Sequence, residues 1–188
     1  MKTIYFITHP EVIKDLSQPV NQWKLSEEGK DRLKKLAQED FWNRVQHIFS
    51  SKEIKSIQTA EILSEITKIP TEVFPNLQEN YRTDELLEEK DYKNVFKRFF
   101  NYPKDSVRGW ETASDAQKRI IGAISAIDEL YPDLKTIAII GHGVTGTLLL
   151  CNMLEHPIDS SIGQERVGCI VELDWEHKFA VSNEWQTY

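Results

Sequence analysis

The sequence predicts an α/β fold, a three-layer α/β/α sandwich built around a mostly parallel sheet. Short apolar runs alternate with amphipathic segments in the order β-α-β-α-β, as parallel strands joined by crossover helices require. The first run, TIYFIT at residues 3–8, is apolar almost continuously rather than at every second position. Such a run is typical of a strand that is covered on both faces.

The other elements follow from local patterns along the chain. Ser26 is placed to cap a helix whose first turn carries Glu27 and Glu28, as the helix dipole favours. No repeat or linker interrupts the pattern, so we expect one domain over residues 1–188. The later segments are predicted as a strand at 46–51, a helix at 57–67, a strand at 71–74, helices at 84–100 and 113–130, a strand at 135–140, a helix at 144–154, and two strands within 169–185.

Composition and charge exclude several functional classes. The formal net charge of −7 argues against a nucleic-acid partner, because phosphate backbones attract basic surfaces. The longest apolar runs are too short to cross a membrane, and no signal-like segment is expected at the amino end. Cys151 and Cys169 lie in apolar surroundings without a disulfide-like spacing, which predicts reduced core residues and a cytoplasmic location.

A glycine-rich stretch, IAIIGHGVTG, suggests one kind of phosphate site. Gly141, Gly143 and Gly146 form a G-x-G-x-x-G after a predicted strand and at the start of a predicted helix, as in dinucleotide-binding loops. The motif occurs late in the chain, however, and Asp159 follows no strand that would present it to a ribose. A dinucleotide-binding module is therefore the less favoured alternative.

Two histidines at strand ends suggest a different chemistry. His9 follows the first predicted strand and His142 follows the fourth, so a parallel sheet directs both toward the same edge. Imidazole is largely unprotonated near neutral pH and is a suitable nucleophile toward phosphorus. One ring can attack while the other stabilises the phosphoryl oxygens, and a carboxylic acid can protonate the leaving group.

Six segments in the same order resemble the histidine phosphatase superfamily, the phosphoglycerate mutase-like proteins. The resemblance covers nearly the whole chain. The matching pieces are Thr8-His9-Pro10 for Arg-His-Gly, KLSEEG (24–29) for pLT..G, SSKEIKSIQTA (50–60) for SSpl.Ra.qTA, Leu77-Gln78-Glu79 for L.E, Trp110-Glu111-Thr112 with Asp115 and Arg119 for GES…D…R, and His142-Gly143 for HG.

The resemblance implies a role for each matching residue. His9 is implied as the residue that is transiently phosphorylated, Glu79 as the proton donor and His142 as the second pocket histidine. Gly143 is implied to offer a backbone N–H to the phosphate. No cofactor or metal is implied, and the sequence contains no closely spaced ligand set that would argue for a metal.

The chain departs from the family at the residues that hold phosphate. The two family arginines correspond to Thr8 and Lys55, which we expect to be the phosphate-binding residues here. A threonine offers one neutral hydroxyl, and a lysine lacks the bidentate geometry of arginine. Pro10 replaces the glycine and removes a backbone N–H donor. Arg82, Arg108, Lys14 and Lys52 are further cations that can complete the pocket.

The sequence therefore predicts a metal-independent phosphomonoester hydrolase that acts through a phosphohistidine on a small phosphorylated substrate. The short chain favours a phosphatase over a mutase. The alternative is a weakened or inactive member that binds a phosphorylated ligand or a protein. The sequence does not indicate the oligomeric state.

Overall fold

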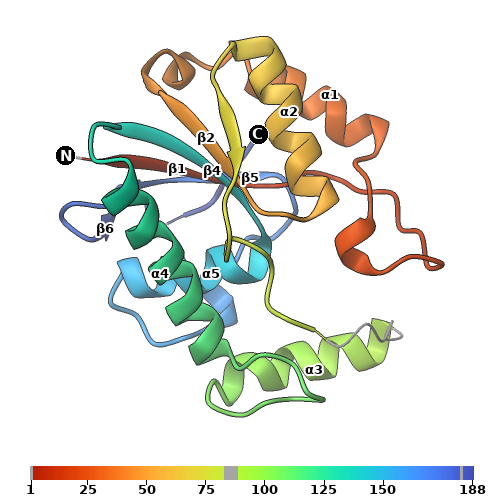
Figure 1. Cartoon of the computed structure of the whole chain (residues 1–188). Helices are drawn as coiled ribbons and strands as arrows, with labels where there is room; N and C mark the ends of the chain where they lie inside the picture. Colours follow the sequence, from red (N-terminus) through yellow and green to blue (C-terminus); the bar gives the residue numbers. More distant parts are fainter. Residues whose placement is uncertain (1, 83–88, 183) are drawn as a thin grey trace.

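The chain folds into a three-layer α/β/α sandwich in the computed structural model. The structure describes residues 2–82, 89–182 and 184–188, and at residues 89 and 90 it describes only the backbone. Figure 1 shows α1 and α2 on one face of the sheet and α4 and α5 on the other. The elements are β1 (Thr3–Thr8), α1 (Glu27–Leu36), β2 (His47–Ser50), α2 (Ile54–Thr67), β3 (Thr71–Val73), α3 (Glu89–Asn101), α4 (Ala113–Leu130), β4 (Thr136–Gly141), α5 (Gly143–Met153), β5 (Cys169–Asp174), β6 (Phe179–Ala180) and β7 (Gln186–Thr187).

The sheet combines a parallel centre with an antiparallel edge. Its strand order is β3-β2-β4-β1-β5-β6, and β7 also pairs with β5. The strands β3, β2, β4 and β1 are parallel, whereas β5 runs antiparallel to β1. The predicted fold class is confirmed, but the sheet is mixed. The pair β5–β6 is antiparallel because the short turn between these strands can join only strands of opposite direction.

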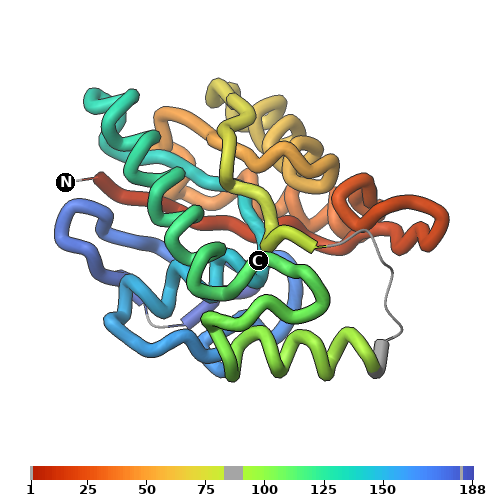
Figure 2. Tube along the Cα trace, turned by 60° about the horizontal axis from the view of Figure 1, so that its bottom comes forward, coloured from red at the N-terminus to blue at the C-terminus, as the bar shows by residue number. Residues whose placement is uncertain are grey.

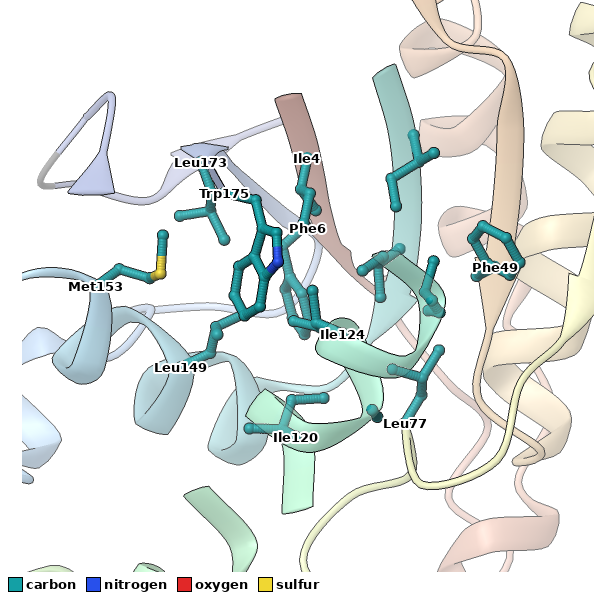
Figure 3. Packing of buried hydrophobic residues seen from close by; sticks show 14 of the residues in the cluster. Ile4, Phe6, Phe49, Leu77, Ile120, Ile124, Leu149, Met153, Leu173 and Trp175 are labelled. Carbon is teal, nitrogen blue, oxygen red and sulfur yellow. The ribbon is translucent and has the colours of Figure 1, made fainter. Parts of the chain in front are cut away.

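Strand β1 is buried on both faces, as its sequence predicts. Ile4 and Phe6 belong to the core between the sheet and α4 and α5, and Tyr5 and Ile7 to the core under α1 and α2. Figure 3 shows Ile4 and Phe6 packed among side chains of the first core. Each face of the strand therefore holds one helical layer, and its carboxyl end is fixed in position by both.

Two glycines of the G-x-G-x-x-G are explained by close packing. A Cβ on Gly141 would overlap the ring of Phe6, and one on Gly146 would lie within 2.8 Å of the same ring and within 2.7 Å of Trp185. Both separations are too short for a side chain to be accommodated without displacing a buried aromatic residue. These glycines therefore allow α5 to pack against the sheet.

The helix boundaries that the structure describes agree with the sequence patterns to within one residue, except at the start of α2. The Ser26 side chain accepts a hydrogen bond from the Gly29 N–H and caps α1 as predicted. Helix α2 begins at Ile54, three residues before the predicted helix. The predicted helix at 84–100 falls partly on 83–88, which lie outside the described residues. Figures 1 and 2 show α3 apart from α1 and α2.

Candidate active site

The carboxyl ends of β1 and β4 bring the two histidines together. Thr8 pairs with Gly141 in the sheet register, so the next residues, His9 and His142, leave neighbouring strands side by side. The centroids of their rings lie 5.4 Å apart at an interplanar angle of 64°. The crevice at the carboxyl ends of parallel strands is where open α/β folds place their chemistry.

His9 is held in one tautomer and lines a pocket. Its Nδ1 lies 2.9 Å from the carbonyl oxygen of Pro10. A carbonyl oxygen only accepts hydrogen bonds, so Nδ1 carries the proton and Nε2 holds the lone pair. Burial, with a smaller contribution from the Lys55 ammonium, lowers the pKa of His9 to about 4. The imidazole is therefore neutral, with a nucleophilic nitrogen, across the physiological pH range.

His142 is completely buried beside His9. Its Nε2 lies 2.6 Å from Ser51 Oγ and 3.5 Å from Glu53 Oε1. Its Nδ1 has no hydrogen-bond partner among the described residues. Burial lowers the pKa of His142 to about 3, and the nearby Glu53 carboxylate opposes this effect. A buried imidazole nitrogen without a partner is unusual in a folded protein and is typical of a group that meets a ligand.

Glu79 lies at the amino end of α5. Its carboxylate oxygens accept hydrogen bonds from the N–H groups of Val144 at 3.2 Å and Thr145 at 3.0 Å. The loop that carries it is held by Arg119, which donates to the carbonyl oxygens of Gln78 at 3.0 Å and Glu79 at 3.2 Å. The last residue of the GES…D…R segment thus fixes the position of the predicted acid.

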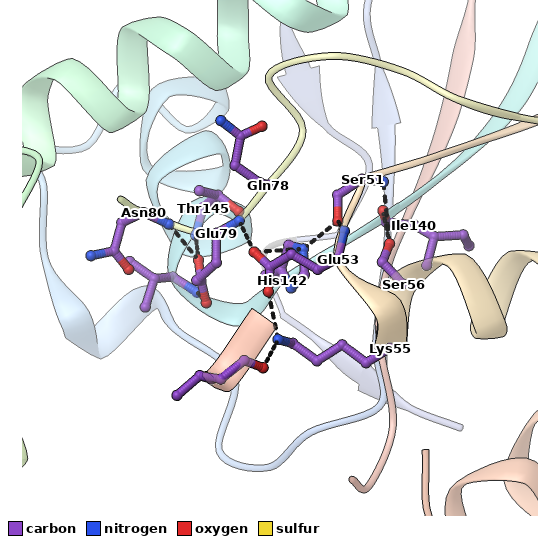
Figure 4. Close-up of polar contacts among 12 residues, drawn as sticks. Ser51, Glu53, Lys55, Ser56, Gln78, Glu79, Asn80, Ile140, His142 and Thr145 are labelled. Atoms are coloured by element: carbon purple, nitrogen blue, oxygen red, sulfur yellow. Dashed lines mark hydrogen bonds and ion pairs between the residues drawn. The ribbon is translucent and has the colours of Figure 1, made fainter. Parts of the chain in front are cut away.

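Lys55 is buried in an ion pair with a residue that the sequence analysis did not select. Its Nζ lies 2.5 Å from Glu53 Oε2 and donates to the Val20 carbonyl oxygen at 2.9 Å. Glu53 Oε1 also accepts from the Glu79 N–H at 2.8 Å (Figure 4). Burial acts to raise the pKa of Glu53, but His142, the Lys55 ammonium and the Glu79 N–H lower it, and the net effect is well below its usual range. Glu53 therefore connects Lys55, His142 and the Glu79 backbone.

Thr8 and Gly143 differ in their access to the pocket beside His9. Thr8 is fully buried; its hydroxyl donates to Gln164 Oε1 at 2.7 Å and accepts from the Cys169 N–H at 3.0 Å. Gly143 begins α5 and lines the pocket. The structure therefore places Gly143 at the pocket surface and Thr8 behind it.

A pocket of about 280 Å³ opens in front of His9. It brings together His9, Glu79 and Gly143, whereas His142 and Lys55 lie behind its lining. Aromatic and aliphatic side chains form part of the wall, and hydroxyl and amide groups form the rest. These lining residues are Tyr92, Phe96, Val144, Thr147, Ser160, Gly163, Gln164 and Val167.

The family of the chain follows from a family-model match. Residues 4–187 match the model of the histidine phosphatase superfamily (branch 1). The chain belongs to this superfamily. Membership confirms the predicted family and the predicted enzyme class, a histidine-type phosphatase. It favours that class over the dinucleotide-binding alternative.

Several solved structures share the histidine phosphatase fold of this chain. A mycobacterial glucosyl-3-phosphoglycerate phosphatase in complex with VO3 is 17% identical, with a TM-score of 0.78 over 99% of this chain and 97% of that one. A phosphoserine phosphatase from Entamoeba histolytica is 16% identical, with a TM-score of 0.78 over 100% and 98%. An α-ribazole phosphatase from Shigella flexneri is 16% identical, with a TM-score of 0.71 over 99% of both chains. No curated protein sequence matches significantly.

The charges of this histidine phosphatase site are paired. Lys55 pairs with Glu53, and Arg82 Nη2 lies 3.8 Å from Glu79 Oε2. Arg82 also lies over the rings of Tyr92 and Trp110, at 5.3 and 4.9 Å from their centroids. Arg82, one of the four further cations predicted for the pocket, therefore contacts site residues within the described part of the chain. Lys14, Lys52 and Arg108 are exposed.

Two site residues, Glu53 and Gln164, were missed by sequence reasoning. Glu53 occupies the apolar position of the SSpl.Ra.qTA pattern, so a charge at that position was an available signal. Gln164 lies 156 positions from Thr8 in a segment without a motif, and only the tertiary fold brings the two together. Among the described residues, no cluster of three or more His, Cys, Asp or Glu side chains is arranged to hold a metal ion, and no helix is long and apolar enough to cross a membrane.

Removing one partner of the Glu53–Lys55 pair is expected to destabilise the protein strongly. Lys55→Met leaves a buried carboxylate unpaired and should lower the free energy of unfolding by about 3 kcal/mol, and Glu53→Leu should do the same. The double variant should recover most of this loss, because neither charge is left buried alone. Urea unfolding at pH 7 measures all three.

An exposed pair gives the matched control. Lys30 and Glu27 lie 2.7 Å apart on the surface of α1, so Lys30→Met should change the free energy of unfolding by no more than about 0.5 kcal/mol. Additive losses in the double variant would show that the buried pair does not act as a unit.

The free energy of unfolding is expected to fall as the pH is lowered from 6.5 toward 4. His9 and His142 have pKa values of about 4 and about 3 in the folded protein, below the ordinary value of 6.5. Below pH 6.5 the unfolded chain binds protons that the folded protein excludes, and each histidine contributes a slope of up to about 1.4 kcal/mol per pH unit.

A variant isolates this contribution from those of other groups. Asp174 raises the pKa of His177, which gives a slope of the opposite sign in the wild-type protein. His142→Gln should reduce the slope between pH 6.5 and 5 by about the share of one histidine, measured by urea unfolding at a series of pH values. An unchanged slope in this variant would contradict the lowered pKa of His142.

Proposed function

We propose that the chain hydrolyses small phosphomonoesters in two steps through a phosphorylated His9. The observation that carries this proposal is the position of His9, which lines the same pocket as Glu79 and whose Nδ1 is taken up by the Pro10 carbonyl oxygen, so that the lone pair is on Nε2. In the first step Nε2 attacks phosphorus, the bond from phosphorus to the ester oxygen breaks, and Glu79 gives its proton to that oxygen. In the second step Glu79 takes a proton from water, the water oxygen attacks phosphorus, and the P–N bond breaks.

The phosphoryl oxygens need donors that do not move during the reaction. The Gly143 N–H is one such donor. The N–H groups of the next two residues of α5, Val144 and Thr145, donate to the Glu79 carboxylate, and the Gly146 N–H donates to the His142 carbonyl oxygen, so the Gly143 N–H is the one we assign to phosphate. We assign His142 as a second: with Ser51 as the donor to its Nε2, the Nδ1–H is left for a phosphoryl oxygen, and because the ring lies behind the lining in the free protein, the substrate must displace part of that lining to reach it. Fixed donors of this kind stabilise the charge that spreads over the oxygens in phosphoryl transfer.

The predictions of cellular location, domain organisation and substrate size become part of this proposal. We place the chain in the cytoplasm because Cys151 and Cys169 are free and buried. We treat residues 1–188 as one domain because strands from both ends of the chain join one sheet. The substrate is a small phosphorylated molecule because the pocket has a volume of about 280 Å³.

A second candidate function is binding of a phosphorylated ligand without turnover. It is favoured by the two positions that replace family arginines: Thr8 is buried behind the wall, and the charge of Lys55 is neutralised by Glu53. Release of inorganic phosphate from an aryl phosphate, compared with calorimetric binding of orthovanadate, separates the two functions. Turnover together with binding supports hydrolysis, whereas binding without turnover supports the second candidate.

A further inference from the structure

The hydroxyl of Thr8 orients the amide of Gln164. Thr8 Oγ accepts a hydrogen bond from the Cys169 N–H at 3.0 Å. Its own hydrogen has two acceptors within reach, Gln164 Oε1 at 2.7 Å and the Cys169 carbonyl oxygen at 3.3 Å, and the shorter contact assigns it to Gln164. A hydroxyl donor must face the carbonyl oxygen of an amide rather than its nitrogen. Oε1 of Gln164 therefore points toward Thr8, and Nε2 points away from it.

The Gln164 Nε2 is directed toward the start of α5. A Cβ built on Gly143 would lie 2.9 Å from Nε2, so the amide nitrogen packs directly over this glycine. Gln164 lines the same pocket as His9, Glu79 and Gly143. In the described part of the chain no acceptor takes a hydrogen bond from Nε2, and the two N–H groups of this amide are thus available beside the Gly143 N–H.

We propose that Gln164 contacts a phosphoryl oxygen through Nε2 and that Thr8 is its positioning residue. Thr8 and Gln164 together then supply the donors that an arginine at position 8 supplies in the family pattern. This inference rests on the proposed function, because it assigns a further contact in the same pocket. It also explains why a threonine that never reaches the pocket is placed directly before His9.

The competing explanation is that Gln164 only ties its loop to β1. Variants of Gln164 and Thr8 separate the two explanations. Loss of a purely structural contact lowers the free energy of unfolding, whereas loss of a phosphoryl contact lowers kcat/KM and the affinity for orthovanadate. Gln164→Ala removes the donors, and Gln164→Glu replaces them with a carboxylate that repels phosphate. Thr8→Val removes the orienting hydroxyl at nearly constant size, and Thr8→Ser retains it. Glu165→Ala, at the neighbouring exposed residue, is the control.

The expected results are ordered. Gln164→Ala should lower kcat/KM for an aryl phosphate roughly ten- to hundredfold, as loss of a hydrogen bond to a charged group predicts. It should weaken orthovanadate binding by a similar factor, and Gln164→Glu should weaken it at least as much. Thr8→Val should act in the same direction, Thr8→Ser should stay close to wild type, and the double variant Thr8→Val/Gln164→Ala should lose no more than Gln164→Ala alone. Urea unfolding of each variant verifies that it is folded.

Several results would overturn the inference. If Gln164→Ala changes kcat/KM and orthovanadate binding less than twofold while His9→Ala is inactive, Gln164 is not a contact and the proposed function stands. If the wild-type protein shows no turnover, the proposed function fails, and calorimetric binding of orthovanadate then tests the Gln164 contact. Equal orthovanadate affinity of wild type and Gln164→Ala, or no binding by either protein, would overturn the contact. Additive losses in the double variant refute the positioning role of Thr8.

Discussion

Replacing His9 with alanine is expected to reduce phosphomonoester turnover by a factor on the order of 10⁴ or more, as removal of a catalytic nucleophile does in other enzymes. The reason is geometric. Nδ1 is committed to the Pro10 carbonyl oxygen, so Nε2 of His9 is the nitrogen available for attack in the pocket. His142 cannot replace it, because in the proposed site its Nδ1 carries the proton and its Nε2 is occupied by the Ser51 hydroxyl. Release of inorganic phosphate from an aryl phosphate at pH 7 measures the effect.

Two controls make this result interpretable. The His9→Gln variant should be equally inactive, because an amide has a similar size but no nucleophilic nitrogen. His156→Ala, at an exposed histidine remote from the pocket lining, should retain wild-type turnover. Turnover within tenfold of wild type in His9→Ala would contradict the assignment of the nucleophile.

Replacing Glu79 with glutamine is expected to lower kcat/KM by about 10²–10⁴ for an alkyl phosphate, the range for loss of a general acid. An aryl phosphate with a good leaving group should lose much less in the first step, because its oxygen departs without full protonation. Glutamine retains one carbonyl oxygen for the N–H groups of Val144 and Thr145, so α5 should remain folded. The ratio of the two losses is therefore the informative quantity.

The measurement is a comparison of kcat/KM for the alkyl and the aryl phosphate in wild type and variant, because kcat/KM reports the phosphorylation step and excludes the later attack of water, in which Glu79 is the base. Glu111→Gln, at a carboxylate that pairs with Arg119 outside the pocket lining, tests whether any loss comes from displacement of the Glu79 loop instead. Such a displacement should reduce kcat/KM for both substrates equally. Equal losses for both substrates in Glu79→Gln would argue against proton donation by this residue.

Much of the fold and the centre of the site could be predicted from local patterns. The strand ends of a parallel sheet meet at one edge, so the positions of His9 and His142 after apolar runs were enough to predict their proximity. Glu79 lies in a loop without a regular pattern, and only the family resemblance indicated it. The antiparallel edge formed by β5 could not be inferred from its apolar run, because the direction of a strand depends on the connection that precedes it.

The arrangement of charge and hydrogen bonds could not be predicted from the sequence. The family pattern predicts Lys55 to be a phosphate-binding cation, but its ammonium forms a buried ion pair with Glu53. The family pattern predicts that the Thr8 hydroxyl donates a weak hydrogen bond to phosphate, but this hydroxyl donates to Gln164, which is far away in the sequence. Pairings of this kind depend on side-chain positions in three dimensions, and they determine which groups are free to meet a ligand.

The paired charges distinguish this site from one that depends on arginine clamps. The described residues around the two imidazoles form the Glu53–Lys55 and Glu79–Arg82 pairs, so the donors we assign to phosphate are neutral N–H groups. Hydrogen bonds from neutral donors are weaker than those from guanidinium groups. A modest catalytic rate with a generic aryl phosphate is therefore expected from this arrangement.

Covalent trapping tests the central claim most directly. The 188-residue protein is mixed with a ³²P-labelled phosphomonoester, quenched during turnover, and digested to locate the label. The account predicts protein-bound phosphate on His9 that is labile in acid and stable in base, and that is absent from His9→Ala. Turnover with no label on His9 at any quench time, or equal labelling of the His9→Ala variant, would contradict the account.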